Sequence, residues 1–290
     1  MLYAFVPAFL TTMGTGLATG SPTGAWGLTR LVSAWTGNVV RVRRSSDNTE
    51  QDFGLSGTEL DTSGLLTFCG AGNGFVRTLY DQSGNSRDVG QATTGSQPQI
   101  VSSGAMVTLG GKSAMDFDGT DDWLESTATT GNLFTNTTGL MAVVWRVDAI
   151  NTNSGSAYND DGLWADREHT GGAGDGSFMG SHLRSSGPDI QAYNWDGNED
   201  KATQTVATAT DYVHIWRHAS SNIYSYLNNS TPASTGSTNT SSLTAHFAFG
   251  RNYASAYYDG KIASAVAYNN DPSAATLGAA LAAYYGITWT

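Results

Sequence analysis

The sequence has little charge, and basic charge is the scarcer kind. Its 290 residues include 14 Lys and Arg against 25 Asp and Glu, so the formal net charge is −11. An acidic surface of this kind repels phosphate groups, which argues against DNA, RNA and anionic membranes as partners. Neutral carbohydrate remains compatible with this composition.

Cysteine is almost absent, since Cys69 is the single one. No intramolecular disulfide can form, and a Cys between "LLTF" and Gly is expected to be a small buried side chain. No run after the first segment approaches the roughly 20 apolar residues of a membrane span. The first segment, "MLYAFVPAFLTTMGTGLATG", is apolar but lacks the basic start of a signal peptide and contains Pro7. We therefore expect residues 1–20 to form an arm that docks on a partner or on the domain itself.

Short β-like runs, separated by Gly, Asn and Asp, fill the chain from residue 39 onward. Runs such as "LMAVVWRV" and "YVHIWRH", together with 35 Gly, predict an all-β sandwich or barrel. No linker divides residues 21–290, so we expect one domain. Two short helices are predicted, near residues 25–34 and 273–285. The second has Asp271 as its expected N-cap, Pro272 at its first turn and Gly286 after its end.

The stretch "RVRRSSDNTEQDF" concentrates basic charge, with three arginines in residues 41–44. Val40 and Val42 alternate with Arg41 and Arg43, as in a strand with one buried face. Three acids follow, so the stretch has no net charge. We interpret it as a structural strand whose arginines bond nearby carboxylates.

The segment "DFDGTDDW" is rich in carboxylates. Oxygen-rich loops that contain Gly suit Ca²⁺, and the candidate ligands are Asp116, Asp118, Asp121 and Asp122. The alternative, which we favour, is a strand that ends in a Gly/Asp turn whose carboxylates cap backbone amides. No other cofactor is expected, because the sequence has no P-loop, dinucleotide fingerprint, HExxH or paired CxxC.

Two further loops could bind or process sugars. In "YNDDGLWADREHTGGAGDG", Asp166, Glu168 and Asp175 could supply the carboxylate pair of a glycoside hydrolase. Tryptophan and tyrosine offer flat rings with polar edges on which sugars stack. The residues expected to bind glycan in Asp- and Asn-rich loops are Trp164, Trp195, Tyr193, Tyr257 and the adjacent Tyr258, with Asp161 and Asp196. Trp145 and Trp216 lie inside strand-like runs and are expected in the core.

Three stretches carry a family resemblance: "LTRLVSAWTGNVVRVRRSSDN", "TFCGAGNGFVRTLYDQSGN" and "GAMVTLGGKSAMDFDG". Their order resembles the catalytic domain of the glycoside hydrolase family 54 α-L-arabinofuranosidases, and "YDQSGN" is the most specific piece. The end, "YYDGKIASAVAYNNDPSAATLGAALAAYYG", is similar to the last strand and helix of laminin G-like and concanavalin A-like domains. The resemblance covers residues 25–286 and implies a concanavalin A-like β-sandwich of jelly-roll type.

The same resemblance implies where a catalytic pair should lie. The family's nucleophilic Glu follows a short "GAG", where "GAGDGSFMG" has Gly176 or Ser177 and the adjacent carboxylate is Asp175. The family's acid/base Asp follows a Gly-rich strand end, where "FGRNYAS" has Arg251 and Asn252. The family's vicinal disulfide is replaced within "NDDGLWAD". Retaining hydrolysis needs two carboxyl groups about 5 Å apart. Because neither matching position has a carboxylate, a non-catalytic relative is expected.

Stand-alone domains of this kind look similar to proteins of bacteriophages and bacteria. The chain is accordingly predicted to be a bacteriophage virion protein, in capsid decoration or in the tail or its fibres, with a lectin-like domain that binds surface glycans. Its N-terminal arm would contact other virion proteins, in many copies or as a homo-oligomer. The expected location is the virion, assembled in the bacterial cytoplasm, with secretion as the alternative. Two other functions stay open: an α-L-arabinofuranosidase-type glycoside hydrolase, and a decoration protein without a ligand.

Overall fold

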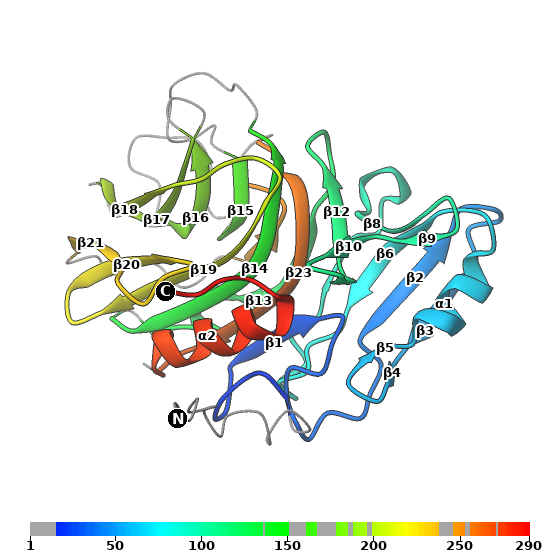
Figure 1. The fold of residues 1–290 in the computed structure, drawn as a ribbon, viewed down its shortest axis with the longest axis horizontal. Coiled ribbons are helices and arrows are strands. Elements are labelled where there is room, and N and C mark those ends of the chain that lie inside the picture. Colours follow the sequence, from blue (N-terminus) through cyan, green and yellow to red (C-terminus); the bar gives the residue numbers. More distant parts are fainter. Residues whose placement is uncertain are drawn as a thin grey trace, which may run out of the picture.

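A computed structural model of the chain describes residues 16–135, 137–150, 161–166, 178–184, 188–195, 199–237, 246–252, 256–270 and 272–290. The side chains at positions 127, 166, 178 and 195 lie outside this description. Antiparallel strands make up about half of the described chain, and 19 of them form one continuous sheet that wraps into two facing layers (Figure 1). The all-β sandwich expected from the sequence is confirmed.

The first layer is formed by β1 (Gly24–Gly27), β14 (Gly139–Ala149), β19 (Thr210–Ala219), β20 (Asn222–Leu227), β21 (Ala233–Gly236) and β23 (Asp259–Tyr268). The second is formed by β13 (Leu124–Thr129), β15 (Asp161–Asp166), β16 (Phe178–Arg184), β17 (Asp189–Trp195), β18 (Glu199–Thr205) and β22 (His246–Phe249). The strands that connect them are β2 (Val40–Arg44), β3 (Glu50–Phe53), β6 (Gly74–Leu79), β7 (Val89–Gly90), β8 (Gln99–Ser102), β9 (Ala105–Met106) and β12 (Met115–Asp118).

Short elements complete the fold. Two small hairpins pair β4 (Leu55–Ser56) with β5 (Glu59–Leu60), and β10 (Thr108–Leu109) with β11 (Lys112–Ser113). In the described part of the chain, the helices are α1 (Thr62–Cys69), α2 (Ala274–Tyr285) and two single 3₁₀ turns, η2 (Thr94–Ser96) and η3 (Thr130–Asn132). Cys69 ends α1 and is buried, as the sequence suggested.

Strand β14 shows how the two cores form. Its residues are buried on both faces over most of its length, so the strand is a continuous apolar run. Trp145 and its neighbours on the same face join the core between the two layers, whereas Val144 belongs to a second core under α2. In Figure 1, α2 lies across the outer face of β14 and β1. Trp145 and Trp216 are core residues, as predicted.

The predicted C-terminal helix is confirmed over 274–285. Ser273 is its N-cap, and the Ser273 hydroxyl accepts a hydrogen bond from the Thr276 amide at 3.3 Å. The predicted start, with Asp271 as N-cap and Pro272 in the first turn, is two residues too early, because Pro272 precedes the cap; Asp271 itself lies outside the described residues. Gly286 ends the helix with φ +69, a left-handed conformation that glycine adopts without strain.

The helix predicted near residues 25–34 is wrong. Residues 24–27 form β1, which pairs with β23 in the register Trp26↔Ala265. Ala25 and Trp26 are both fully buried, but they enter different cores because successive strand side chains point to opposite faces. Burial on both faces hides the period of two, so the apolar pattern resembles that of a helix.

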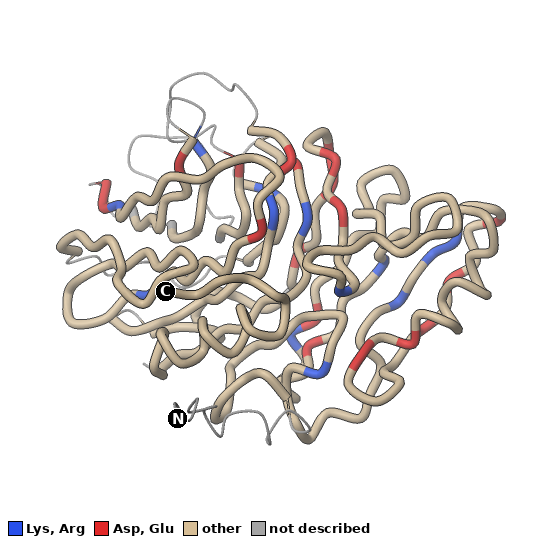
Figure 2. The backbone as a smooth tube through the Cα atoms, in the orientation of Figure 1, with Lys and Arg blue, Asp and Glu red and all other residues tan. Residues whose placement is uncertain are grey.

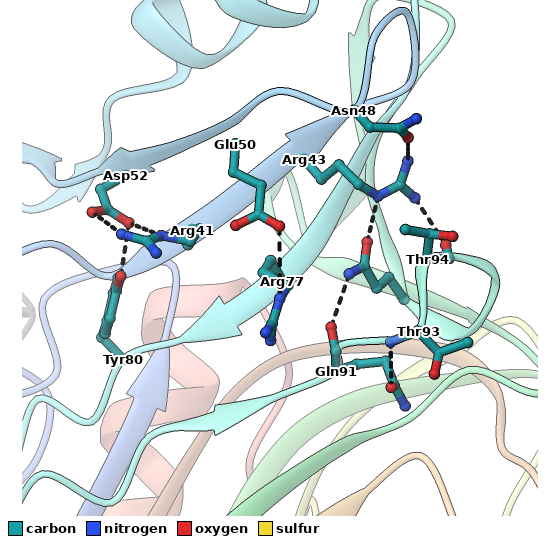
Figure 3. A network of polar contacts seen from close by, with 11 residues as sticks. Arg41, Arg43, Asn48, Glu50, Asp52, Arg77, Tyr80, Gln91, Thr93 and Thr94 are labelled. Carbon is teal, nitrogen blue, oxygen red and sulfur yellow. Dashed lines mark hydrogen bonds and ion pairs between the residues drawn. The ribbon is translucent and has the colours of Figure 1, made fainter.

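The arginine stretch is structural, as predicted (Figure 3). Arg41 forms a two-pronged ion pair with Asp52, in which both N···O distances are 2.7 Å. Arg43 is 6% exposed and donates instead to neutral acceptors, namely the side chains of Gln97 and Asn48 and the carbonyl of Thr94. Val42, on the opposite face of β2, is fully buried in the core.

The "YDQSGN" segment is a structural clasp between β6 and β1. The Asp81 carboxylate, 2% exposed, accepts hydrogen bonds from the amides of Ala25, Ser83 and Arg87. The Gln82 side chain accepts from the Leu31 amide at 2.8 Å and donates to two backbone carbonyls of residues 27–29. A buried carboxylate that accepts several hydrogen bonds fixes the chain around it, because each bond replaces one to water.

Within the described residues, no helix is long and apolar enough to cross a membrane. Of the predicted N-terminal arm, residues 1–15 lie outside the described part of the chain. The remainder of the arm contacts the domain, because Leu17 and Ala18 pack against the core under α2 and the Ala18 amide donates to the Leu31 carbonyl at 2.8 Å.

Candidate active site

A bulge in β15 shapes the centre of the second layer. Asp161 pairs with Leu183 and Gly162 with His182, but Trp164 pairs with Ser181, so Leu163 is one residue in excess. Bulges of this kind bend a strand and redirect side chains, and they are frequent next to active sites. Asp161, immediately before the bulge, is 1% exposed.

Gly162 allows another segment to approach the bulge closely. A Cβ atom at Gly162 would lie 2.4 Å from the backbone nitrogen of Asn252, which is closer than real atoms pack. Asn252 follows β22, is fully buried, and donates its amide to the Ala256 carbonyl at 3.0 Å. The glycine therefore brings Asn252 against β15.

His182 and Tyr193 form the other side of this region. Their rings are stacked, with centroids 5.4 Å apart and planes 19° from parallel. Both side chains are at most 1% exposed, and burial lowers the pKa of His182 to about 3 because the protonated ring loses its hydration. His182 is thus a neutral imidazole at physiological pH. A Cβ at Gly180 would lie 2.7 Å from His182 Nε2, so a second glycine makes room for this ring.

The candidate site therefore consists of Gly162, His182, Tyr193 and Asn252. Asp161 pairs with Leu183 and Gly162 with His182, so Asp161 lies on the opposite face of the sheet from His182, with the core residue Leu183. A neutral imidazole, a phenol and an amide can donate to and accept from hydroxyl groups, which are the groups that sugars present.

Among the described side chains of β15, β16, β17 and β22, Asp161 is the buried carboxylate. Asp189, at the start of β17, is half-buried and lies one residue from Ile190, which pairs with Leu183 beside Asp161. The sequence signals for His182 and Asn252 were weak, because no motif or spacing around either residue indicates a role in binding.

The side chains of the predicted hydrolytic residues Asp166, Glu168 and Asp175 are not described, so their catalytic role stays a prediction. Glu168 and Asp175 lie outside the described residues, and of Asp166 only the backbone, at the end of β15, is described.

The expectation that Trp164 and Tyr193 present open rings in loops is wrong. Trp164 lies in β15, has no exposed surface, and packs edge-on against Trp216 with ring centroids 5.5 Å apart. Tyr193 is likewise buried in β17. The polar neighbours that suggested loops belong to strands, so these aromatic side chains point into packed layers.

Tyr258 is also buried, and its hydroxyl donates to the backbone carbonyls of Arg146 and Lys261. Tyr257 is half-buried beneath the guanidinium of Arg251, whose Cζ lies 5.5 Å from the ring centroid. The side chain of Trp195 and all of Asp196 lie outside the described residues, so their predicted role in glycan binding stays a prediction.

The acidic turn after β12 brings three of the four predicted calcium ligands together. Carboxylate oxygens of Asp118, Asp121 and Asp122 lie within 4.8 Å of one another. Asp116 instead forms an ion pair with Lys261 at 3.2 Å. Figure 2 shows the acidic residues along β12 and the turn beyond it; the neighbouring β23 contributes one basic residue, Lys261.

Hydrogen bonds in this turn match the favoured alternative of carboxylates that cap amides. Asp118 accepts from the amides of Thr120 and Asp121 at 2.8 and 3.3 Å, and Asp122 accepts from the Asp118 amide at 3.2 Å. Burial, followed by repulsion from Asp118, raises the pKa of Asp122 to about 7. Three carboxylates provide only part of the six to eight oxygens that Ca²⁺ takes, and calcium binding stays a prediction.

Residues 17–119 match the family described as Alpha-L-arabinofuranosidase B, catalytic. The match covers the clasp of Asp81 and Gln82 but ends before β15, so it includes none of the candidate site. No curated protein matches the chain.

Solved structures share the fold at low sequence identity. A mutant family 54 α-L-arabinofuranosidase soaked with 4-nitrophenyl α-L-arabinofuranoside has a TM-score of 0.66 at 18% identity. An arabinofuranosidase in complex with arabinofuranosyl-α-1,2-xylobiose has a TM-score of 0.65 at 19% identity. Each alignment covers 89% of this chain and 61% of the other. A Trypanosoma rangeli sialidase is more distant, with a TM-score of 0.53 at 12% identity over 95% of this chain and 37% of that one.

These comparisons support the resemblance to the family 54 catalytic domain and correct the functional prediction. The family match and the two arabinofuranosidase structures described above concern arabinofuranosidases, and none of them points to a bacteriophage particle. The interpretation as a virion structural protein is therefore wrong, and the alternative stated beside it, a glycoside hydrolase of α-L-arabinofuranosidase type, fits the findings better.

Proposed function

We propose that this chain is a glycoside hydrolase-type domain for α-L-arabinofuranosyl groups, with its sugar site where β15, β16 and β17 meet Asn252. The match over residues 17–119 and the shared fold support the substrate class. The observation that carries the location is the pairing of Gly162 with His182 beside the bulge, at the point where Gly162 makes room for the backbone of the buried Asn252.

Hydrolysis at this site needs two carboxyl groups, one to attack or activate water and one to donate a proton. Asp161 lies on the opposite face of β15 from Gly162, so we assign it no catalytic role. The two carboxyl groups would come from Asp166, Glu168 and Asp175. His182 is neutral across the physiological range, so it would orient hydroxyl groups as donor or acceptor and would not serve as the proton donor.

A second candidate function is arabinofuranoside binding without turnover. It rests on Asn252, which occupies the stretch where the family resemblance places an acid/base Asp. A carboxamide forms hydrogen bonds to a sugar but cannot act as a general acid at neutral pH.

Hydrolysis of 4-nitrophenyl α-L-arabinofuranoside, followed by nitrophenolate absorbance, tests the proposal. We expect turnover that is abolished by two of the three substitutions Asp166→Asn, Glu168→Gln and Asp175→Asn. Asp47→Asn, in the turn after β2, removes an exposed ion pair with Arg44 and is the control that should keep wild-type turnover.

Calorimetric titration with an arabinofuranosyl-substituted xylobiose separates the two candidates. Binding without turnover supports the binding domain. If the wild-type chain neither binds nor hydrolyses these compounds, the arabinofuranoside assignment is wrong.

A further inference from the structure

Arg251 lies between two aromatic rings from different parts of the chain. Its guanidinium carbon is 5.0 Å from the ring centroid of Trp123, just before β13, and 5.5 Å from that of Tyr257. Arg251 and Tyr257 also form an isolated antiparallel bridge. A planar, permanently charged guanidinium attracts aromatic faces, and two rings hold it more firmly than one.

This clamp closes on the segment that carries Asn252. The Asn252 amide donates to the Ala256 carbonyl and the Tyr258 amide to the Gly250 carbonyl, both at 3.0 Å, so residues 250–252 lie beside residues 256–258. Gly250 has φ +81, and a Cβ there would lie 2.3 Å from the Phe117 ring. The segment is thus held against the core on one side and against Trp123 on the other.

The backbone of residues 251–252 also contacts β15. Backbone atoms of Arg251 and Asn252 lie 2.4 to 2.7 Å from where a Gly162 Cβ would stand. A shift of this backbone would change the position of Asn252 relative to His182. The stacking of Arg251 on Trp123 connects the segment to the turn before β13, so this side chain can set where the backbone lies.

We propose that Arg251 is a positioning residue, whose clamp between Trp123 and Tyr257 holds Asn252 at the sugar site. The proposal rests on the proposed function for the placement of the sugar. Arg251 acts through the backbone of Asn252, so its loss weakens substrate binding more than it slows the chemical step.

Arg251→Lys is the deciding variant, because it keeps the charge but loses the planar group that stacks on both rings. Arg217→Lys is the matched control, since Arg217 stacks on Tyr224 at 4.6 Å on the outer face of the first layer. Amide hydrogen exchange is measured for residues 120–124, 250–252 and 256–258, together with affinity for the arabinofuranosyl xylobiose, KM and kcat.

We expect exchange in these three segments to rise about tenfold in Arg251→Lys. Affinity should fall by a similar factor through KM with kcat nearly unchanged, and Arg217→Lys should alter neither. Unchanged exchange in Arg251→Lys would overturn the clamp. Faster exchange with unchanged affinity would reduce it to a structural contact and overturn the positioning role. If the wild-type chain binds no arabinofuranoside, the proposed function has failed and the positioning role fails with it, while the exchange data still decide whether the clamp exists.

Discussion

The carboxylate of Asp81 accepts a hydrogen bond from the backbone amide of Ala25 at 2.9 Å and thereby joins the end of β6 to β1. This contact lies in the segment that most closely resembles the arabinofuranosidase family, and its role is structural. The family match over residues 17–119 therefore includes a clasp that stabilises the fold, while the side chains that would contact a sugar lie beyond it.

Replacement of Asp81 by Ala should destabilise the domain by roughly 3 kcal/mol, because buried amides would lose a charged acceptor. Urea unfolding followed by tryptophan fluorescence measures the change. Asp61→Ala is the control: Asp61 caps α1 through the Gly64 amide at 3.0 Å, and loss of a cap costs about 1 kcal/mol. Equal losses for the two variants would contradict the clasp.

The arginines of β2 should differ in their contributions to stability. Arg43→Ala removes a side chain that is 6% exposed and leaves the buried oxygen of the Gln97 side chain without its donor. Asn48 and Thr94 are exposed and can bond water, so we expect a loss of about 1 to 3 kcal/mol. Arg41→Ala removes an ion pair whose arginine side chain is 42% exposed, so the expected loss is about 0 to 1 kcal/mol.

Chemical denaturation of both variants decides this prediction, and sugar affinity should be unaffected in each. A larger loss for Arg41→Ala than for Arg43→Ala would refute it.

The sequence was sufficient to predict the sandwich and the C-terminal helix, because both are local patterns. Alternation in β2, the apolar stripe of α2 and Gly286 at its end can be identified without knowledge of the tertiary contacts, although the N-cap of α2 is Ser273 and not the predicted Asp271. The strand at Trp26 could not be identified in this way, because its two faces are buried in different cores. Helix α1 was missed as well; its eight residues include Gly64 and show a weak apolar face.

The candidate site was harder to predict because long-range pairing creates it. The excess residue Leu163, the gap at Gly162 and the approach of Asn252 arise only when β15 pairs with β16 and β22. The polar residues next to Trp164 in the sequence suggested an exposed loop, whereas strand pairing buries the Trp164 side chain completely. Sequence neighbours were thus a poor guide to exposure where strands are short and bulged.

The acidic turn should make stability depend on pH. The pKa of Asp122 is about 7 in the folded protein, above its ordinary value of 3.8, so the folded state favours the protonated form. The contribution of Asp122 to the free energy of unfolding is fully present below pH 4. As the pH rises through about 7, the free energy of unfolding should fall by on the order of 2 to 4 kcal/mol. Asp122→Asn, which keeps an acceptor for the Asp118 amide, should remove this dependence. Thermal melts from pH 4 to 9 measure it, with Asp189→Asn as control.

Calcium provides a second test at the same turn. If the predicted calcium site exists, about 5 mM CaCl₂ at pH 8 should raise the melting temperature of the wild type, because ionised carboxylates would gain a cation. Asp122→Asn should lose most of that rise, and MgCl₂ should produce little of it. An identical response of both proteins to both salts would exclude the site.

Gly162→Ala tests the location of the proposed site. The added methyl group would lie 2.4 Å from the nitrogen of Asn252 and 2.5 Å from the carbonyl carbon of Arg251, so the backbone must move. Overpacking of this kind costs about 1 to 3 kcal/mol in stability, and a displacement near 1 Å can lower turnover roughly 100-fold. Gly236→Ala is the control, because a Cβ at Gly236 in β21 meets nothing within 4 Å. Circular dichroism melts establish folding, and titration with the arabinofuranosyl xylobiose measures affinity. A folded Gly162→Ala variant with wild-type affinity and turnover would show that the sugar site does not include Asn252, because no other described segment is displaced as directly by this substitution.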